Sequence, residues 1–200
     1  MSKHIVMRIL RSTDHKKMPW KNGGGITTEI AVFPPDAGLD DFHWRVSTAR
    51  VEQNGPFSIF PGVDRSLCLL DGFGVTLKVQ GRMPFGMTRR CEPFVFAADV
   101  PSEAMLMSGP ITDLNVMTRR GLYESEVQLV EVSGRLPLAK AGEVSILIAD
   151  GEGLSIEDGD RTVKLERGDA VLLGPGDTAT LSAKRRTYAI NITILPARQD

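Results

Sequence analysis

Apolar and polar residues alternate along most of this chain in short runs that turn residues separate. Gly, Pro, Asp and Asn interrupt the runs before apolar positions at helical three-and-four spacing can build up. The pattern predicts strands at Ile26–Phe33, Trp44–Val51, Ser66–Leu70, Val75–Val79, Phe94–Ala97, Leu114–Thr118, Glu126–Val132, Val144–Ala149, Gly153–Glu157, Arg161–Glu166, Ala170–Leu173 and Thr187–Leu195. Short strands at regular spacing with turns between them favour an antiparallel sandwich or barrel. We therefore expect an all-β fold.

A faint internal repeat divides the chain in two. An apolar run, Asp71–Gly72 and a second strand in the first half correspond to an apolar run, Asp150–Gly151 and a second strand in the other half. The halves meet near Gly121–Glu131 without a Gly/Ser-rich linker, which favours a tight interface. We expect two barrels, one over residues 1–125 with the pocket and a smaller, tightly packed one over residues 126–200 that is open to strand exchange.

Composition and charge exclude several classes of partner. The 200 residues include 24 Lys or Arg and 25 Asp or Glu, a net charge of −1, so no electrostatic field favours nucleic acid or an anionic membrane. The N-terminal stretch lacks the apolar core of a signal peptide, and no apolar run approaches the roughly 20 residues that span a bilayer. We expect a cytoplasmic protein with reduced cysteines, no nucleic-acid or membrane partner, and the option of a homodimer.

One motif in the second half resembles a motif of cupin barrels. Gly168–Asp169, the apolar run Ala170–Leu173 and the segment Gly174–Asp177 form a turn, a strand suited to burial and a tight Pro-Gly turn. Metal-binding cupins add a His-x-His pair, a carboxylate and a later histidine. This chain has 3 histidines, none of them in such a pair. We therefore predict no metal site and no other cofactor.

Ordered sequence blocks resemble the HutD/Ves family of cupin-like proteins. The blocks are Met18–Ile30 (MPWKNGGGITTEI), Trp44–Ala49 (WRVSTA), Gly55–Ser58, Phe60–Gly62, Asp64–Arg65, Gly109–Pro110 and Thr112–Met117. The resemblance implies a cupin-like (RmlC-like) double-stranded β-helix. It also implies a cytosolic protein associated with histidine utilisation or stress response, and for HutD-like members a regulatory sensor of a pathway intermediate such as formylglutamate.

Polar side chains gather on one face of three predicted strands. Residues two apart along a strand share a face, and the polar pairs are Thr27 and Glu29, Arg45 and Ser47, and Asp113 and Asn115. Ile30 and Val32 are expected on the face opposite Glu29. Alone, the pattern is typical of strands with one face in water. The family resemblance favours convergence of these faces on one pocket.

The chemistry of these side chains suits a small carboxylate. Arg45 and Arg65 carry planar guanidinium groups that bind carboxylates in bidentate fashion. The chain also offers Lys21, Asn22 and Gly23 before these arginines, with a positive charge, an amide and an accessible backbone N–H. The carboxylates of Glu29 and Asp113 orient the cations or bind an amide on the ligand. The predicted ligand-binding residues are Lys21, Asn22, Gly23, Glu29, Arg45, Ser47, Arg65, Asp113 and Asn115.

Structural roles compete with this interpretation. Gly23–Gly25 also suits a turn, and Asp64–Arg65 a local ion pair. Trp20 and Trp44 are expected to pack, although Trp20 is also placed to form a wall of the pocket.

Three functions are compatible with the sequence. The favoured one is a regulatory protein that binds a small formylglutamate-like carboxylate without transforming it, so that no residue is catalytic. The second is a metal-independent isomerase or hydrolase with Glu29 or Asp113 as general base. The third is a structural interaction module. The fold hosts all three, but the absence of a nucleophile–base pair favours binding.

Overall fold

The structure is a computed structural model that describes residues 7–20, 23–138, 144–159 and 161–198. Strands make up its regular structure apart from one 3-10 turn in the described ranges, η1 (Ser12–Asp14). All the predicted strands are present, so the all-β prediction is confirmed. Strands that the alternation did not predict are β1 (Arg8–Leu10), β2 (Lys16–Pro19), β5 (Gly55–Pro56), β8 (Phe85–Met87) and β10 (Ser102–Leu106).

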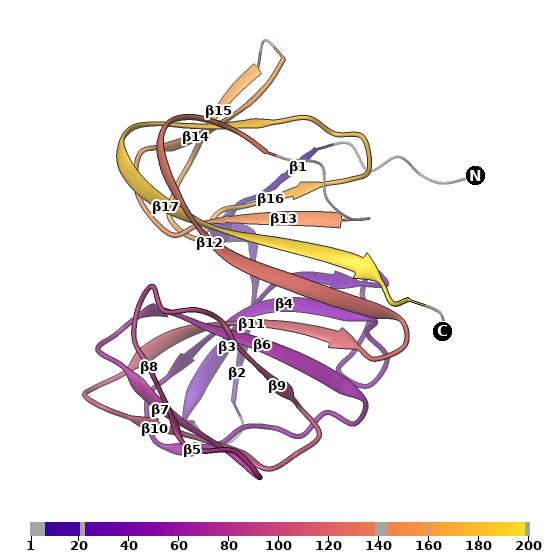
Figure 1. Cartoon of the computed structure of the whole chain (residues 1–200), viewed down its shortest axis with the longest axis vertical. Helices are drawn as coiled ribbons and strands as arrows, with labels where there is room; N and C mark the ends of the chain where they lie inside the picture. The colour runs from indigo at the N-terminus through magenta and orange to yellow at the C-terminus, as the bar shows by residue number, and fades with distance from the viewer. Residues whose placement is uncertain (1–6, 21–22, 139–143, 160, 199–200) are drawn as a thin grey trace. The chain divides into compact units, whose positions relative to one another are not determined.

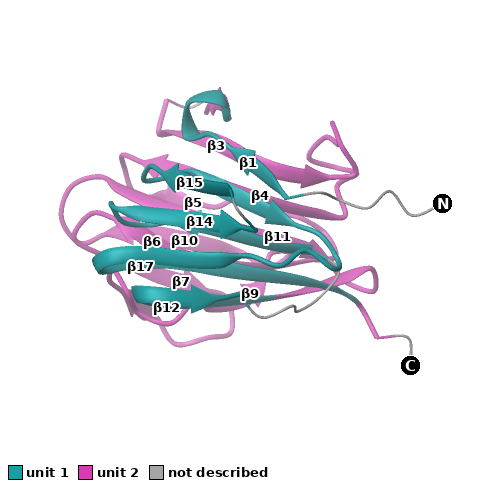
Figure 2. Cartoon of the chain, turned by 90° about the horizontal axis from the view of Figure 1, so that it is seen from above, with its two compact units in different colours: residues 1–15, 126–196 teal, residues 16–125, 197–200 magenta. Residues whose placement is uncertain are grey.

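The described strands form two compact units, coloured separately in Figure 2. Unit 1 contains the described residues of 1–15 and 126–196, and unit 2 those of 16–125 and 197–200. The sequence pattern places residues 1–125 in one barrel. In the structure the described residues 7–15 belong instead to unit 1, because β1 pairs antiparallel with β16 (Ala170–Leu173).

Unit 2 consists of two antiparallel sheets (Figure 1), and a cluster of buried apolar residues joins them. The six-stranded sheet has the order β2, β3 (Gly25–Phe33), β4 (Trp44–Val51), β11 (Ile111–Arg119), β6 (Val63–Asp71) and β9 (Phe94–Ala97). The four-stranded sheet has the order β5, β10, β7 (Val75–Val79) and β8. Leu67 of the first sheet and Leu77 and Met87 of the second are buried in the same cluster. Full burial of such side chains stabilises the fold by about 1.5–3 kcal/mol each.

Unit 1 is built on one seven-stranded sheet. Its order is β1, β16, β13 (Val144–Ala149), β17 (Thr180–Pro196), β14 (Leu154–Asp158) and β15 (Arg161–Leu165), with β12 (Tyr123–Pro137) also on β17. The long β17 pairs with β13 over residues 189–194 and with β14 over residues 180–183. One strand therefore joins the two parts of the sheet around a core that includes Leu147, Ile156 and Leu181.

The register of the six-stranded sheet in unit 2 aligns polar side chains in two neighbouring rows. The rows are Glu29, Ser47 and Asn115 on β3, β4 and β11, and Arg45, Met117 and Arg65 on β4, β11 and β6. Residues directly opposite one another on paired strands share a face of the sheet. The predicted common faces of Arg45 with Ser47 and of Asp113 with Asn115 agree with this register.

A β-bulge in β3 changes the face on which the side chains beyond it lie, including that of Val32. The register with β4 shifts between Glu29 and Ala31, so that Val32 lies opposite Arg45. One extra residue in a strand reverses the alternation beyond it. The prediction that Val32 faces away from Glu29 is therefore wrong, and Val32 packs with Met117 in an apolar cluster.

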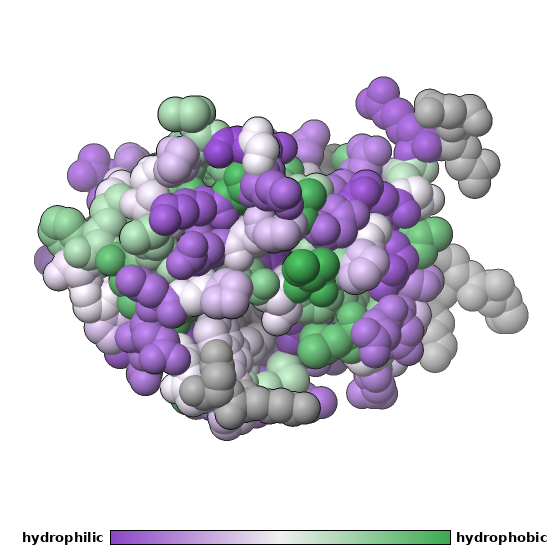
Figure 3. Space-filling model, turned by 90° about the horizontal axis from the view of Figure 1, so that it is seen from below, coloured by the Kyte–Doolittle hydropathy of each residue, from purple (hydrophilic) through white to green (hydrophobic). Residues whose placement is uncertain are grey.

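The surface carries apolar side chains among polar ones. Phe73 is 72% exposed and Met83 is 85% exposed. On the face in Figure 3, hydrophobic groups are interspersed with hydrophilic ones, as is ordinary for a folded domain. In the described part of the chain, no helix is long and apolar enough to cross a membrane.

Candidate functional site

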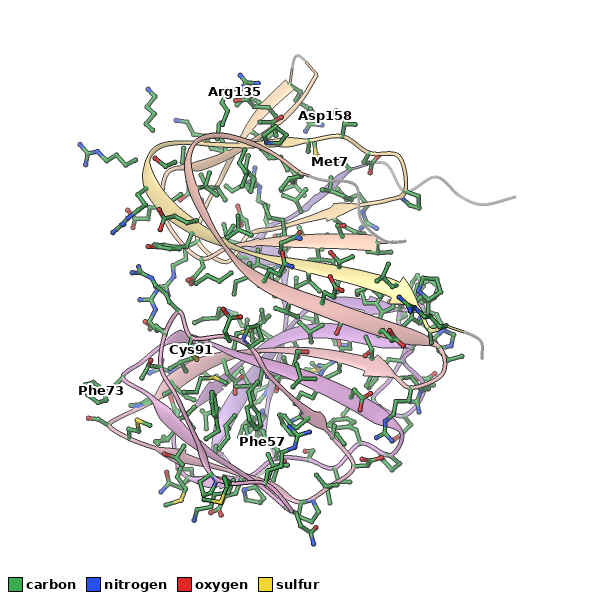
Figure 4. The ribbon with its side chains drawn as sticks, viewed as in Figure 1. Met7, Phe57, Phe73, Cys91, Arg135 and Asp158 are labelled. Carbon is green, nitrogen blue, oxygen red and sulfur yellow. The ribbon has the colours of Figure 1, made fainter. Side chains whose placement is uncertain are left out.

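A cavity of about 510 Å³ lies in unit 2. Its described lining consists of Met18, Pro19, Trp20, Thr27, Leu39, Arg45, Ser47, Ala49, Pro56, Phe57, Ser58, Phe60, Arg65, Asn115 and Met117. Phe57 is labelled in Figure 4, where it lies among the strands of this unit. The volume is within the range of about 300–1,000 Å³ that is usual for sites of small molecules.

Arg45 is a buried cation with an incomplete set of partners. The residue is 4% exposed. Its Nε donates to Oε2 of Glu29 at 2.7 Å, and its Nη1 donates to Oγ of Ser47 at 3.4 Å. The negative charge of Glu29 offsets part of the free-energy cost of burying the guanidinium. Nη2 of Arg45 has no hydrogen-bond partner among the described residues.

Arg65 is a second buried cation, and aromatic rings surround it. Its guanidinium carbon lies 5.1 Å from the centroid of Phe57, 5.5 Å from that of Phe60 and 5.6 Å from that of Phe96. Nη2 donates to the carbonyl oxygen of Ser58 at 3.4 Å, whereas Nε has no partner within the described part of the chain. Burial lowers the pKa of Arg65 to about 10, so the side chain remains a cation at neutral pH.

Asp113 lies two residues before Asn115 on the same face of β11 and is completely buried. Nδ2 of Asn115 donates to Oδ1 of Asp113 at 2.8 Å, and Oδ2 of Asp113 has no described partner. Burial raises the pKa of Asp113 to about 7, although the nearby Arg65 acts in the opposite direction. The carboxyl is therefore partly protonated at neutral pH, and its proton responds to any charge that binds nearby.

The described charges around the cavity favour an anion. Arg45 and Arg65 carry two positive charges, Glu29 carries one negative charge, and Asp113 is only partly ionised at neutral pH. Each arginine also has one buried nitrogen that lacks a described partner, Nη2 in Arg45 and Nε in Arg65. Buried donors are nearly always hydrogen-bonded in folded proteins, and a charged acceptor satisfies a guanidinium best.

Trp20 forms one wall of the cavity. Its Nε1 donates to Oγ1 of Thr27 at 2.7 Å, and its backbone N–H donates to the carbonyl oxygen of Gly25 at 2.9 Å. A Cβ at Gly25 would lie 3.2 Å from the Trp20 ring and would clash with the carbonyl oxygen of Arg50. Glycine at this position therefore allows the wall to pack closely against β4.

The predicted site residues fall into four groups. Those that line the cavity are Arg45, Ser47, Arg65 and Asn115, and those that hydrogen-bond to a lining side chain are Glu29 and Asp113. Gly23 is exposed in a turn with φ of 70°, where its N–H donates to the carbonyl oxygen of Trp20, and it is not part of the lining. Lys21 and Asn22 lie outside the described residues.

Sequence reasoning missed most of the apolar lining. Phe57, Phe60 and Met117 lie within blocks that carry the family resemblance, but large apolar residues in strands and turns usually indicate core packing. Leu39 lies in a segment without a strand pattern and gave no signal. Within the described ranges, no three His, Cys, Asp or Glu side chains come together as a metal site would need.

Comparisons with known proteins agree with this architecture. The HutD family model matches residues 12–190. Protein Ves from Citrobacter koseri is 37% identical over 175 residues, which cover 80% of this chain and 90% of Ves. A conserved protein of unknown function from Pseudomonas aeruginosa has a TM-score of 0.87 at 31% identity, covering 96% of this chain and 100% of that one. HutD from Pseudomonas fluorescens has a TM-score of 0.80 at 25% identity with the same coverage.

A more distant structure shows the fold alone. Protein YlbA from Escherichia coli is 10% identical, with a TM-score of 0.71 over 100% of this chain and 96% of that one. Together with the all-β strand order, such neighbours show a cupin-like fold.

Proposed function

This chain belongs to the HutD family, and from that premise we propose that it binds a small carboxylate metabolite in the cavity of unit 2. The pair of buried arginines carries the proposal. Arg45 and Arg65 line the same cavity, and each holds an N–H without a described partner. A carboxylate has two oxygens that accept such hydrogen bonds and a negative charge that matches the excess positive charge.

Both arginines are already held in place before a ligand binds. Glu29 and Ser47 fix the guanidinium of Arg45, and three aromatic rings confine that of Arg65. Binding therefore costs little additional side-chain entropy. A charge-assisted hydrogen bond to a carboxylate contributes about 1.5–3 kcal/mol, and it also removes the penalty of an unpaired buried donor.

Formylglutamate-like acids are the first ligands to test, and the proposed role is regulation in histidine utilisation or stress response. The similarity to proteins called HutD and Ves supports this role. In this proposal the protein is cytoplasmic, senses its ligand without transforming it, and uses neither a metal nor nucleic acid. Lys21 and Asn22 lie outside the described residues and stay candidate ligand-binding residues of this proposal.

The proposal extends to the architecture. Each unit is taken as one cupin-like barrel of a duplicated chain, with the ligand site in unit 2 and a mainly structural role for unit 1. The buried apolar cluster of unit 1 supports this assignment.

A metal-independent isomerase or hydrolase is the second candidate. The observation in its favour is the pKa of about 7 at Asp113, because a general base works best with a pKa near the operating pH. Two observations favour ligand binding over catalysis. Asp113 is completely buried outside the described lining, and Glu29 is engaged with Arg45. Nuclear magnetic resonance of candidate acids incubated with the purified protein would detect turnover.

Calorimetric titration with formylglutamate and acetate tests the binding site. Arg45→Ala should weaken binding by about 10- to 150-fold, and Arg45→Lys should restore part of the loss because lysine keeps the charge without the fork. Arg50→Ala is the matched control, since Arg50 lies on the same strand, is half exposed and pairs with Glu52. Equal affinities in all four proteins would remove Arg45 from the site. Failure of every acid to bind the wild type would overturn the proposed function.

A further inference from the structure

The cavity has a charged end and an apolar remainder. Arg45 and Arg65 are the charged side chains of its described lining, and Ser47 and Asn115 lie beside them in the same two rows of the sheet. The rest of the described lining is uncharged and mostly apolar, and it includes Trp20, Leu39, Phe57 and Phe60.

The apolar part is a built wall rather than a loose surface. The hydrogen bond from Nε1 of Trp20 to Thr27 fixes the plane of the indole, and Gly25 lets that ring lie close to the sheet. Phe57 and Phe60 are held against the guanidinium of Arg65. An aromatic surface therefore begins directly at the cation and continues away from it.

The cavity is also larger than a carboxylate needs. A volume of about 510 Å³ accommodates a ligand with a substantial body behind its head group. That body would replace water along the aromatic and aliphatic wall. Apolar area removed from water is favourable roughly in proportion to its size.

We infer that the ligand is a carboxylate with one acidic group at Arg45 and Arg65 and an apolar body on the wall formed by Trp20, Leu39, Phe57 and Phe60. This inference rests on the proposed carboxylate site, and it favours a monocarboxylate over the dicarboxylate formylglutamate, which serves as the reference ligand. Glu29 already neutralises one of the two arginines, so the described charges call for one anionic group. A second carboxylate lying against the wall would lose its hydration and would meet no charged partner among the described residues. Its burial would therefore be unfavourable.

A matched pair of ligands tests the inference. N-formylnorvaline has the shape of N-formylglutamate with a methyl group in place of the distal carboxylate. We expect calorimetric titration to give a Kd for N-formylnorvaline at least about tenfold lower. In the series acetate, butanoate and hexanoate, affinity should rise by about threefold to fourfold for each methylene that becomes buried.

A variant of the wall provides the second measurement. Leu39 is 52% exposed at the cavity and belongs to no buried cluster, so Leu39→Ala should leave the fold intact. It should reduce the affinity ratio of hexanoate to acetate by about threefold to tenfold. Leu122→Ala is the matched control, because Leu122 is 42% exposed and lies outside the described lining.

The outcomes separate this inference from the proposal beneath it. Tighter binding of N-formylglutamate than of N-formylnorvaline, or equal affinity along the series of acids, would overturn the apolar-body inference and leave the carboxylate site standing. If no acid binds the wild type, or if Arg45→Ala binds every acid unchanged, the proposed function fails and the inference fails with it.

Discussion

Asn115 donates a hydrogen bond from Nδ2 to Oδ1 of Asp113 at 2.8 Å, while the second oxygen of Asp113 has no partner among the described residues. Burial raises the pKa of this carboxyl from 3.8 to about 7. Between these two values the folded chain holds a proton that the unfolded chain has released. The resulting contribution to stability is fully present below about pH 4 and is lost as the pH rises through about 7.

Asp113→Asn should remove this pH dependence. Asparagine cannot ionise and retains an oxygen that can accept the hydrogen bond from Asn115. The unfolding free energy of the variant minus that of the wild type should increase by about 2–4 kcal/mol between about pH 4 and pH 8. Urea denaturation across this range measures it, and all other titrating groups cancel in the difference. A difference that does not change with pH would contradict the raised pKa.

Ligand affinity should depend on the same carboxyl. A carboxylate bound at Arg45 and Arg65 adds negative charge near Asp113 and so favours its protonated form. Binding should then take up a proton, and affinity for acetate should fall by about threefold to tenfold from about pH 6 to pH 8. Titrations in buffers of different ionisation enthalpy detect this proton uptake. Asp113→Asn should abolish it, and its persistence in that variant would assign the uptake to another group.

Glu29→Gln should strengthen anion binding. The substitution removes the negative charge that now pairs with Arg45 at 2.7 Å but keeps an oxygen that can accept its hydrogen bond. We expect affinity for acetate to rise by about threefold to tenfold, with a loss of about 3–5 kcal/mol in stability because the buried Arg45 loses its counter-charge. Glu52→Gln is the control, because Glu52 pairs with Arg50 on the surface. Weaker binding in Glu29→Gln would show that Glu29 positions Arg45 chiefly through its charge.

Gly25→Ala should destabilise unit 2. An added Cβ would clash with the backbone oxygen of Arg50 and crowd the Trp20 ring, and neither neighbour is free to retreat. The expected cost is about 2–4 kcal/mol in unfolding free energy. Gly55→Ala serves as the control, since nothing lies within 4 Å of a Cβ there and Gly55 has no positive φ. Similar urea midpoints for the two variants would argue against the close packing of Trp20.

Alternation predicted the polar faces well because it depends only on local backbone geometry. Arg45 with Ser47 and Asp113 with Asn115 could be assigned in this way. Val32 could not, since a single bulged residue leaves no mark in the sequence. β5 and β8 are too short to alternate, with 2 and 3 residues. The rings around Arg65 come together through loop paths and strand order, which alternation does not contain.

The pairing of β1 with β16 affects how the chain can fold during synthesis. The strands of unit 2 between residues 16 and 125 leave the ribosome as one continuous block, and domains generally fold as they emerge. β1 is made before unit 2, yet its partner β16 emerges only after the strands of unit 2 are complete. A nascent chain can therefore complete the unit that holds the cavity while β1 still waits for β16, and unit 1 is the later of the two units to close.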